Sequence, residues 1–450
     1  MKSNPPVEVE GQRGRLHREI ISLALPALGS LVAEPLFTLA DSAMVGHLGT
    51  GELAGLALAS TLLLTIVGLC IFLAYTTTSA TARKIGAGDT PGALRDGVDG
   101  MWLAIVLGCA LALGLELASD AIVAVFTPDA AAVPHAVSYL RTAAGGLPGM
   151  LLVLAATGVL RGMLDTRTPL VVAAVGAAVN VALNATFIYG FHLGVAGSGL
   201  GTAVTQTGMG VVLAAAVVRH TRRHGVSIRP HGAGILRSTR AGIPLFIRTG
   251  TLRLAILATV TVVTAMGAIE LASYQIINSL WALTALILDA LAIAAQALVG
   301  QSLGAGDRRR VHHMVRIMVR WGITTGMVLG VVMLALAPVG AQLFTSDPQV
   351  HQTTWPALVI SGVCMPLAGW VFILDGILIG AGDGRYLAWA GVITLVVYLP
   401  VLGVIHWLAP TGARGVAWLW LSFALVFMAA RAATTAWRAR GDAWMATATN

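Results

Sequence analysis

The sequence predicts an all-α integral membrane protein with twelve transmembrane helices, arranged as two parallel six-helix repeats. Two observations carry this prediction. Only 11% of the 450 residues are charged and 57% are hydrophobic, whereas a soluble domain carries about 25% charged residues. The two halves of the chain also match at a single offset of 218 residues without any gap, as Pro26 does with Pro244 and Gly49 with Gly267.

The match between the halves extends to short motifs. Residues 52–54 and 270–272 both read Glu-Leu-Ala, and residues 86–89 and 304–307 both read Gly-Ala-Gly-Asp. Self-similarity at one fixed period indicates a duplicated architecture. In membrane proteins, internal repeats are typical of transporters whose binding site lies where the repeats meet.

Twelve stretches are apolar and long enough to cross a bilayer, which takes roughly 20 residues. Each half supplies six, and an even number of crossings returns the chain to its starting side. The halves must therefore point the same way, as parallel rather than inverted repeats. The expected helices lie near 18–45, 53–82, 96–118, 134–160, 168–190, 195–219, 238–264, 271–302, 310–339, 353–377, 387–408 and 413–437.

The placement of Lys and Arg predicts the orientation, because cytoplasmic loops are enriched in these residues. Most of the 28 basic residues fall in the tails and in the loops on one side. We therefore expect a multi-pass protein of a bacterial-type inner (plasma) membrane with both termini in the cytoplasm, and no binding of nucleic acid. The expected segments are a cytoplasmic tail (1–17), an N-lobe of helices 1–6 (18–220), a cytoplasmic linker (221–235), a C-lobe of helices 7–12 (236–437) and a cytoplasmic tail (438–450).

Several function classes are not expected from the sequence. Cys70, Cys109 and Cys364 lie in predicted helices, so no disulfide framework is indicated. The sequence has no nucleotide-binding Gly-x-x-x-x-Gly-Lys-Ser/Thr motif and no cluster of metal ligands. We therefore expect neither an enzyme nor an ATP-driven pump, and neither a catalytic residue, a cofactor nor a bound metal.

Polar residues inside the N-lobe helices predict a functional site. An Asp at the centre of a span raises the free energy of membrane insertion by roughly 2.5–3.5 kcal/mol, so Asp41 is a functional candidate by default. Glu34 and Thr38 share its helix face, since the three residues are spaced four and three apart. Pro26 and Pro35 interrupt the same helix, and a proline inside a helix favours a bend.

Two further helices of the N-lobe carry polar pairs spaced four residues apart. Asn180 and Asn184 form one pair, and Thr202 and Gln206 form the other. Mutual hydrogen bonds are the least costly arrangement for these side chains in lipid, so we expect the polar faces to meet around Asp41. A purely structural polar network between helices is the alternative interpretation.

The C-lobe offers a second set of candidates. On one predicted helix, Asn278, Asp289 and Gln296 fall within about 40° of one another, with Tyr274 and Trp281 on the same helix. These residues, apart from Gln296, are candidates for lining a substrate cavity.

Asp375 is a further C-lobe candidate, which lines the cavity or lies at the cytoplasmic interface. Arg248 and Arg253 either neutralise these acids or extend to the interface. The charges are not duplicated, so the two lobes have specialised: the offset pairs Asp41 with Thr259, Asp289 with Ile71 and Asp375 with Thr157.

Taken together, these motifs resemble the multidrug and toxic compound extrusion family, in particular its DinF-like branch. The resemblance covers residues 16–440 and is carried by five segments: Pro35-Leu-x-x-x-x-Asp41-x-x-x-Val-Gly-His-Leu-Gly49, Ala82-Arg-x-x-Gly-Ala-Gly-Asp89, Leu160-Arg-Gly-x-x-Asp-Thr-Arg-Thr-Pro-Leu170, Asp289-Ala-Leu-Ala-Ile-Ala-Ala-Gln296 and Asp375-Gly-Ile-Leu-Ile-Gly-Ala-Gly-Asp383.

The resemblance implies a V-shaped, two-lobed antiporter that exports lipophilic or cationic compounds by alternating access, in exchange for protons or sodium. It implies that Asp41 is the coupling carboxylate, with Asn180, Asn184 and Thr202 around it. Many relatives have an aspartate where this chain has Asn184. Because hard cations favour several charged oxygen ligands, this difference favours protons over sodium. The expected partners are small-molecule substrates and the bilayer, and a monomer is expected.

Other function classes are weighed against this interpretation. A lipid-linked oligosaccharide flippase of the same superfamily would need a cationic cavity for pyrophosphate, and only Arg248, Arg253 and Arg320 could supply it. A receptor or scaffold would not account for lone buried carboxylates. The major facilitator plan also has six plus six helices, but its basic signature between helices two and three is missing.

Overall fold

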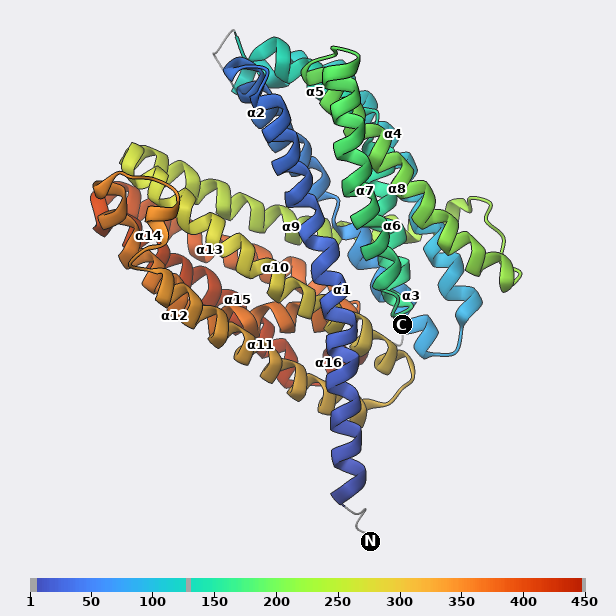
Figure 1. Cartoon of the computed structure of the whole chain (residues 1–450). Coiled ribbons are helices and arrows are strands. Elements are labelled where there is room, and N and C mark those ends of the chain that lie inside the picture. Colours follow the sequence, from blue (N-terminus) through green and yellow to red (C-terminus); the bar gives the residue numbers. More distant parts are fainter. Residues whose placement is uncertain (1–5, 127–130, 447–450) are drawn as a thin grey trace. The chain divides into compact units, whose positions relative to one another are not determined.

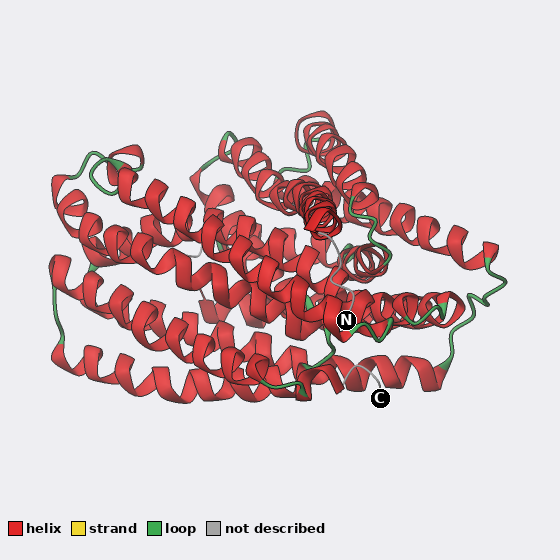
Figure 2. Ribbon diagram, turned by 90° about the horizontal axis from the view of Figure 1, so that it is seen from below, coloured by secondary structure: helices red, strands yellow, loops and turns green. Residues whose placement is uncertain are grey.

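The computed structural model describes residues 6–126 and 131–446, and this part of the chain is built of helices joined by short loops, with no strand (Figures 1 and 2). Within these described residues, eleven helical segments are long and apolar enough to cross a membrane, and a bent helix pair, counted as one span, brings the total to 12. The prediction of an all-α, twelve-span membrane protein is confirmed.

The chain forms two compact units, and the first extends from Ser22 to Gly242. The helix that enters this unit, α1, is unbroken although Pro26 and Pro35 lie inside it. The helices are α1 (Pro6–Gly46), α2 (Thr50–Leu69), α3 (Phe72–Gly86), α4 (Thr90–Phe126), α5 (Val133–Ala144), α6 (Leu147–Gly162), α7 (Arg167–Ala185), the π-helix η1 (Thr186–Gly190) and α8 (Val195–Arg223).

The second unit begins at Ile243 and includes the first turns of α1, up to Ile21. In those turns, His17 Nδ1 accepts a hydrogen bond of 2.7 Å from the Trp321 indole of the second unit. Its helices are α9 (Gly232–Met266), α10 (Ala268–Gly304), α11 (Arg308–Leu336), the 3-10 helix η2 (Gly340–Leu343), α12 (Pro348–Gly380), α13 (Gly384–Leu408), α14 (Gly412–Ser422), the π-helix η3 (Phe423–Met428), α15 (Ala429–Arg440) and α16 (Ala443–Ala446).

These unit boundaries lie inside α1 and α9, whereas the sequence places the lobe boundaries between residues 17 and 18 and at the linker 221–235. The predicted linker 221–235 is non-helical only over residues 224–231, because α8 continues to Arg223 and α9 begins at Gly232. In the predicted tails, residues 1–5 and 447–450 lie outside the described residues. The described part of the first tail is helical from Pro6.

One predicted span is a bent pair, in which α5 and α6 meet at an angle of 52°. Gly145 and Gly146 occupy the break, and Pro148 lies in the first turn of α6. Glycine is a poor helix former, while proline suits a first turn. At the matching positions of the second half, Val363 and Cys364 replace the glycines, and α12 there is unbroken.

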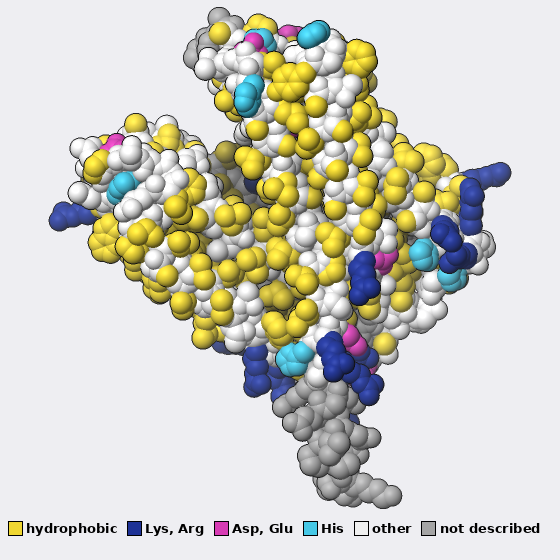
Figure 3. All heavy atoms as spheres, viewed as in Figure 1, with side chains coloured by type: hydrophobic (Ala, Val, Ile, Leu, Met, Phe, Trp, Pro, Cys, Tyr) yellow, Lys and Arg dark blue, Asp and Glu magenta, His cyan; other side chains and the backbone are white. Residues whose placement is uncertain are grey.

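The helix surfaces are apolar and basic side chains gather at helix ends, as a bilayer requires. On the face in Figure 3, hydrophobic side chains cover most of the helices, and Lys and Arg cluster near the ends of helices. Exposed residues such as Leu117, Val331 and Trp407 are at least 64% accessible. In water such a surface would be unfavourable, whereas lipid chains cover it without cost.

Candidate functional site

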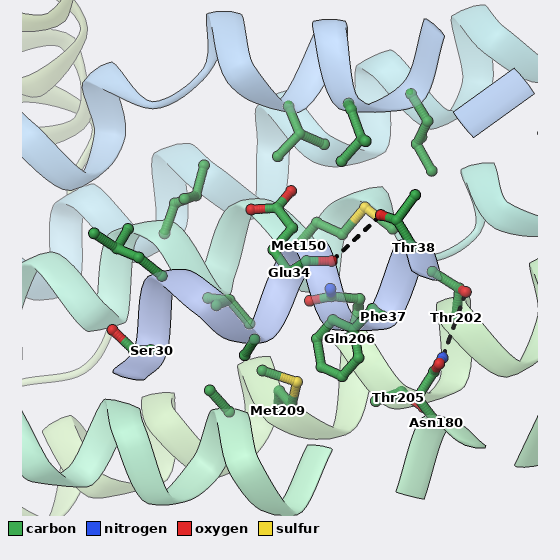
Figure 4. A pocket seen from close by; sticks show the side chains of 18 of the residues that line it. Ser30, Glu34, Phe37, Thr38, Met150, Asn180, Thr202, Thr205, Gln206 and Met209 are labelled. Atoms are coloured by element: carbon green, nitrogen blue, oxygen red, sulfur yellow. Dashed lines mark hydrogen bonds between the residues drawn. The ribbon is translucent and has the colours of Figure 1, made fainter. Parts of the chain in front are cut away.

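A chamber lies inside the first unit, walled by α1, α2, α3, α5, α6, α7 and α8. Its free volume, open mouth included, is about 1380 Å³. Figure 4 shows side chains from several of these helices turned into it. Those labelled there are Ser30, Glu34, Phe37 and Thr38 from α1, Met150 from α6, Asn180 from α7, and Thr202, Thr205, Gln206 and Met209 from α8.

Asp41 is the buried carboxylate of this chamber, with 5% of its surface exposed. The Asn184 side-chain amide donates to Asp41 Oδ1, and the Thr202 hydroxyl donates to Asp41 Oδ2 at 3.3 Å. Asn184 Nδ2 also lies 3.3 Å from Asn180 Oδ1. Asn180 Nδ2 lies 3.5 Å from the Thr202 hydroxyl, a contact drawn in Figure 4. The structure thus brings together the polar faces of three helices around one acid.

Close helix packing makes this cluster possible. A Cβ atom at Gly201 of α8 would lie 1.9 Å from Asn184 Oδ1, so only glycine leaves room for that amide. At Gly149 of α6, a Cβ atom would lie 2.5 Å from the Thr207 backbone of α8. Small residues at such contacts allow helices to approach closely in lipid. These two glycines therefore bring α6, α7 and α8 near enough for their polar groups to meet.

The chamber has a second polar region, away from Asp41 along α1. Glu34 and Gln206 line the chamber, and the Thr38 hydroxyl donates to the Glu34 carbonyl at 3.3 Å. Arg161 from α6 also lines it, with Nη2 lying 3.4 Å from the Ser30 hydroxyl. The chamber therefore presents the Asp41 carboxylate with its neutral donors at one place and the Arg161 guanidinium at another.

Arg161 and Tyr139 are among the chamber residues that sequence reasoning missed. Arg161 belongs to the segment from Leu160 to Leu170 that carries part of the family resemblance, which is the signal that could have found it. Tyr139 of α5 is 3% exposed and lines the same chamber. Its helix has an apolar face, on which a tyrosine indicates packing as readily as a binding site.

In the second unit, Asp375 is held in a buried ion triad. Arg248 of α9 donates from Nη2 to Asp375 Oδ2 at 2.7 Å, and Arg431 of α15 donates to the same oxygen. Arg248, which could neutralise an acid by sequence reasoning, does so. The same pairing removes one of the three arginines that a pyrophosphate-binding flippase would need. Asp375 lines a small pocket with the two arginines, and the chamber belongs to the other unit.

The remaining candidates of the second unit separate into two places. Tyr274, Asn278 and Trp281 of α10 line one pocket together, as their helix spacing suggests. Asp289 is half-buried further along α10, and eight residues of helix put it about 12 Å from Trp281. The structure therefore does not bring Asp289 to the group formed by the other three.

Comparison with known families finds the same duplication. A family model described as MatE matches residues 26–186 and again residues 244–404. The second match begins and ends 218 residues after the first, which is the offset seen in the sequence itself. Together the two matches cover well over half of the chain.

Curated relatives match along nearly the whole length. The chain is 28% identical to Protein DETOXIFICATION 44, chloroplastic, of Arabidopsis thaliana, over 94% of this chain and 82% of the relative. It is 27% identical to DNA damage-inducible protein F of Escherichia coli K12, over 94% of this chain and 93% of the relative.

Solved structures share the fold. The crystal structure of the Vibrio cholerae MATE transporter VcmN in the bent form matches with a TM-score of 0.86 at 20% identity, covering 96% of this chain and 98% of that one. A crystal structure described as MATE in the bent conformation matches over 100% of both chains, with a TM-score of 0.85 and 22% identity.

Proposed function

Because this chain belongs to the MatE family of transporters, we propose that it is a secondary active efflux antiporter that exports lipophilic or cationic compounds in exchange for protons. The observation that carries the proposal is Asp41, a buried carboxylate that lines a large chamber and is held by side-chain donors of two other helices. Intramembrane carboxylates mark ion and substrate pathways.

The proposed exchange follows from what protonation does to this cluster. The ionised carboxylate accepts hydrogen bonds at both oxygens and attracts a cationic compound in the chamber. A proton on either oxygen turns that oxygen into a donor, which then faces the amide of Asn184 or the hydroxyl of Thr202. Protonation thus removes the negative charge of Asp41 together with one of its hydrogen-bond acceptors. Binding of a cationic substrate and binding of a proton therefore compete.

Helix α1 provides a place where this change can be converted into movement. Pro35 has no N–H, so the Leu31 carbonyl one turn earlier lacks its helical hydrogen bond. Pro26 weakens the helix in the same way nearer its start. We propose that protonation of Asp41 lets α1 bend at these prolines, which reshapes the chamber and displaces the bound compound.

The contacts of the cluster favour protons over sodium. Sodium would need several oxygen ligands directed at one point, as hard cations do. In this cluster the nitrogen of the Asn184 amide faces Asp41, and an amide N–H is a donor that cannot coordinate a cation. The cluster as built thus suits a carboxylate that exchanges its charge for a proton.

The proposed setting is an inner (plasma) membrane with both termini in the cytoplasm, based on the distribution of Lys and Arg. The expected partners are small molecules and lipid, and the working unit is a monomer.

The test is transport of rhodamine 6G by the full chain reconstituted in vesicles, with either a proton or a sodium gradient imposed. We expect the proton gradient to drive dye movement in the wild-type protein. Asp41→Asn, which keeps the shape of the side chain, should abolish the driven component. Undiminished transport by Asp41→Asn, or transport driven by sodium alone, would contradict the proposal.

A further inference from the structure

A pocket in the second unit occupies the place that the chamber holds in the first. Its walls come from α9, α10, α13, α14 and η3, and its free volume, open mouth included, is about 440 Å³. Apart from Leu419, every residue that lines it stands 218 positions after a residue that lines the chamber. The duplication has therefore produced two pockets in matching positions, and only one of them contains the carboxylate.

Aromatic rings replace the polar cluster in this second pocket, which we call the aromatic box. Six aromatic side chains line it: Tyr274, Trp281, Tyr398, Trp420, Phe423 and Phe427. Trp281 and Phe423 meet edge to face with centroids 5.1 Å apart, and Phe423 stacks on Phe427 at 4.9 Å. No charged side chain lines the box among the described residues.

The polar groups of the box are few. Thr259, which matches Asp41 in the repeat, forms a hydrogen bond of 3.0 Å with the Tyr398 hydroxyl. The Trp420 indole N–H is buried and has no hydrogen-bond partner in the described structure. A buried donor left without a partner costs about 1–3 kcal/mol, so a ligand with an acceptor group would gain from meeting it. Asn278 brings an amide to the same pocket.

The backbone at the box is also irregular. Phe423 and Phe427 both lie in η3, where the last span follows a π-helix, whereas the matching part of α8 in the first unit is a regular α-helix. Short π-helical turns are rare and occur frequently at functional sites. The irregular turn brings these two rings into contact with each other and with Trp281, Trp420 and Tyr398.

From these observations we infer that the aromatic box is a second ligand site, which binds uncharged aromatic compounds carrying a hydrogen-bond acceptor such as a carbonyl. Small-molecule sites are mostly apolar with a few polar groups that orient the ligand, and the lining of this pocket has that composition. Flat rings would pack edge to face or offset against the aromatic walls. Because no carboxylate lines the box, this binding does not depend on proton exchange at Asp41.

The test is equilibrium binding of 7-diethylamino-4-methylcoumarin, a neutral fluorescent carbonyl compound, to the purified full chain in detergent. We expect saturable binding that is equal at pH 6 and pH 8 and is unchanged in Asp41→Asn. Trp281→Ala should weaken it by roughly tenfold or more, through loss of an aromatic wall. Trp420→Phe, which keeps a ring and removes the N–H, should weaken it by about three- to tenfold.

The matched control is Trp407→Ala, because Trp407 belongs to the same unit but is 81% exposed. Thermal unfolding of each variant identifies those that fold, and if Trp281→Ala does not fold, Trp420→Phe decides. Wild-type affinity in the folded Trp281→Ala or Trp420→Phe protein would overturn the site. Loss of binding in Asp41→Asn would place the ligand in the chamber and would also overturn it. Neither result bears on proton-driven transport.

Discussion

Arg248 donates a hydrogen bond to Asp375 across 2.7 Å and so joins α9 to α12 within the second unit. Arg431 reaches the same carboxylate oxygen from α15, and all three residues are buried or nearly so. The second unit thus also contains an intramembrane acid, but two guanidinium groups keep it paired. Asp41, in contrast, accepts hydrogen bonds from the neutral side chains of Asn184 and Thr202. We interpret the two acids as having different roles, structural for Asp375 and functional for Asp41.

The first prediction concerns the triad. Asp375→Asn leaves two buried guanidinium groups without a counter-charge, and breaking a buried pair costs roughly 3–5 kcal/mol. We expect a clear fall in the thermal unfolding temperature, while the molecules that stay folded keep their proton-driven transport. A triple variant with leucine at 248, 375 and 431 should recover most of the lost stability. A loss of proton coupling in folded, well-expressed Asp375→Asn would assign the coupling role to this unit instead.

The second prediction concerns the ion that couples transport. Asn184→Asp replaces the amide that faces Asp41 with a second carboxylate and so supplies charged oxygen ligands. We expect sodium to stimulate transport by the variant, measured as dye movement in vesicles under a sodium gradient. Thr186→Asp is the control, because Thr186 is exposed nearby on the same span. Equal sodium responses in wild type, variant and control would show that charge at residue 184 does not select the ion.

The third prediction uses two glycines of α8. Gly201→Ala puts a methyl group 1.9 Å from Asn184 Oδ1, whereas Gly208→Ala meets nothing within 4 Å. We expect Gly201→Ala to displace Asn184 from Asp41, to lower transport and to cost about 1–3 kcal/mol of stability. Gly208→Ala should be neutral or slightly stabilising, since alanine is the better helix former. Unfolding temperature and transport rate are measured for both, and equal behaviour would contradict the packing described for α7 and α8.

The fourth prediction concerns the break between α5 and α6. A Cβ atom at Gly146 would lie 2.6 Å from the Ala203 backbone, while one at Gly145 would meet only the Thr142 carbonyl at 3.6 Å. We expect Gly146→Ala to destabilise the protein by about 1–3 kcal/mol through overpacking. Gly145→Ala should cost much less, which comparison of the two unfolding temperatures would check. A larger loss at Gly145 would mean that the backbone conformation, not the close contact, requires glycine there.

The duplication and the polar faces could be predicted because they are regular along the chain. The four-residue spacing of Asn180 and Asn184 predicts that they share a helix face, and the same spacing predicts this for Thr202 and Gln206. A carboxylate inside a span is energetically costly, so the polar faces are expected to meet around Asp41. In the structure, Asn184 and Thr202 donate to Asp41, and Asn180 donates to Thr202.

What could not be predicted depends on contacts between distant residues. Nothing in the local sequence connects Arg431 to Asp375, which lies on another helix 56 residues earlier. The bend at Gly145 and Gly146 is hidden because the flanking residues read as one apolar span. The sequence indicates only the α10 wall of the aromatic box, formed by Tyr274, Asn278 and Trp281. The rest is hidden, since Trp420 and Phe427 in an apolar helix indicate lipid contact as readily as a pocket.

The single buried carboxylate that lines the chamber, within the described part of the chain, limits the energetics of the proposed exchange. One titrating group carries one proton per cycle, so export of a singly charged cation is electrically neutral. Voltage then adds nothing, and each pH unit across the membrane sustains about a tenfold concentration ratio. For an uncharged cargo the same cycle moves one positive charge inward, and 100 mV contributes about 2.3 kcal/mol. The ionisation of the cargo thus decides whether the membrane voltage helps to expel it.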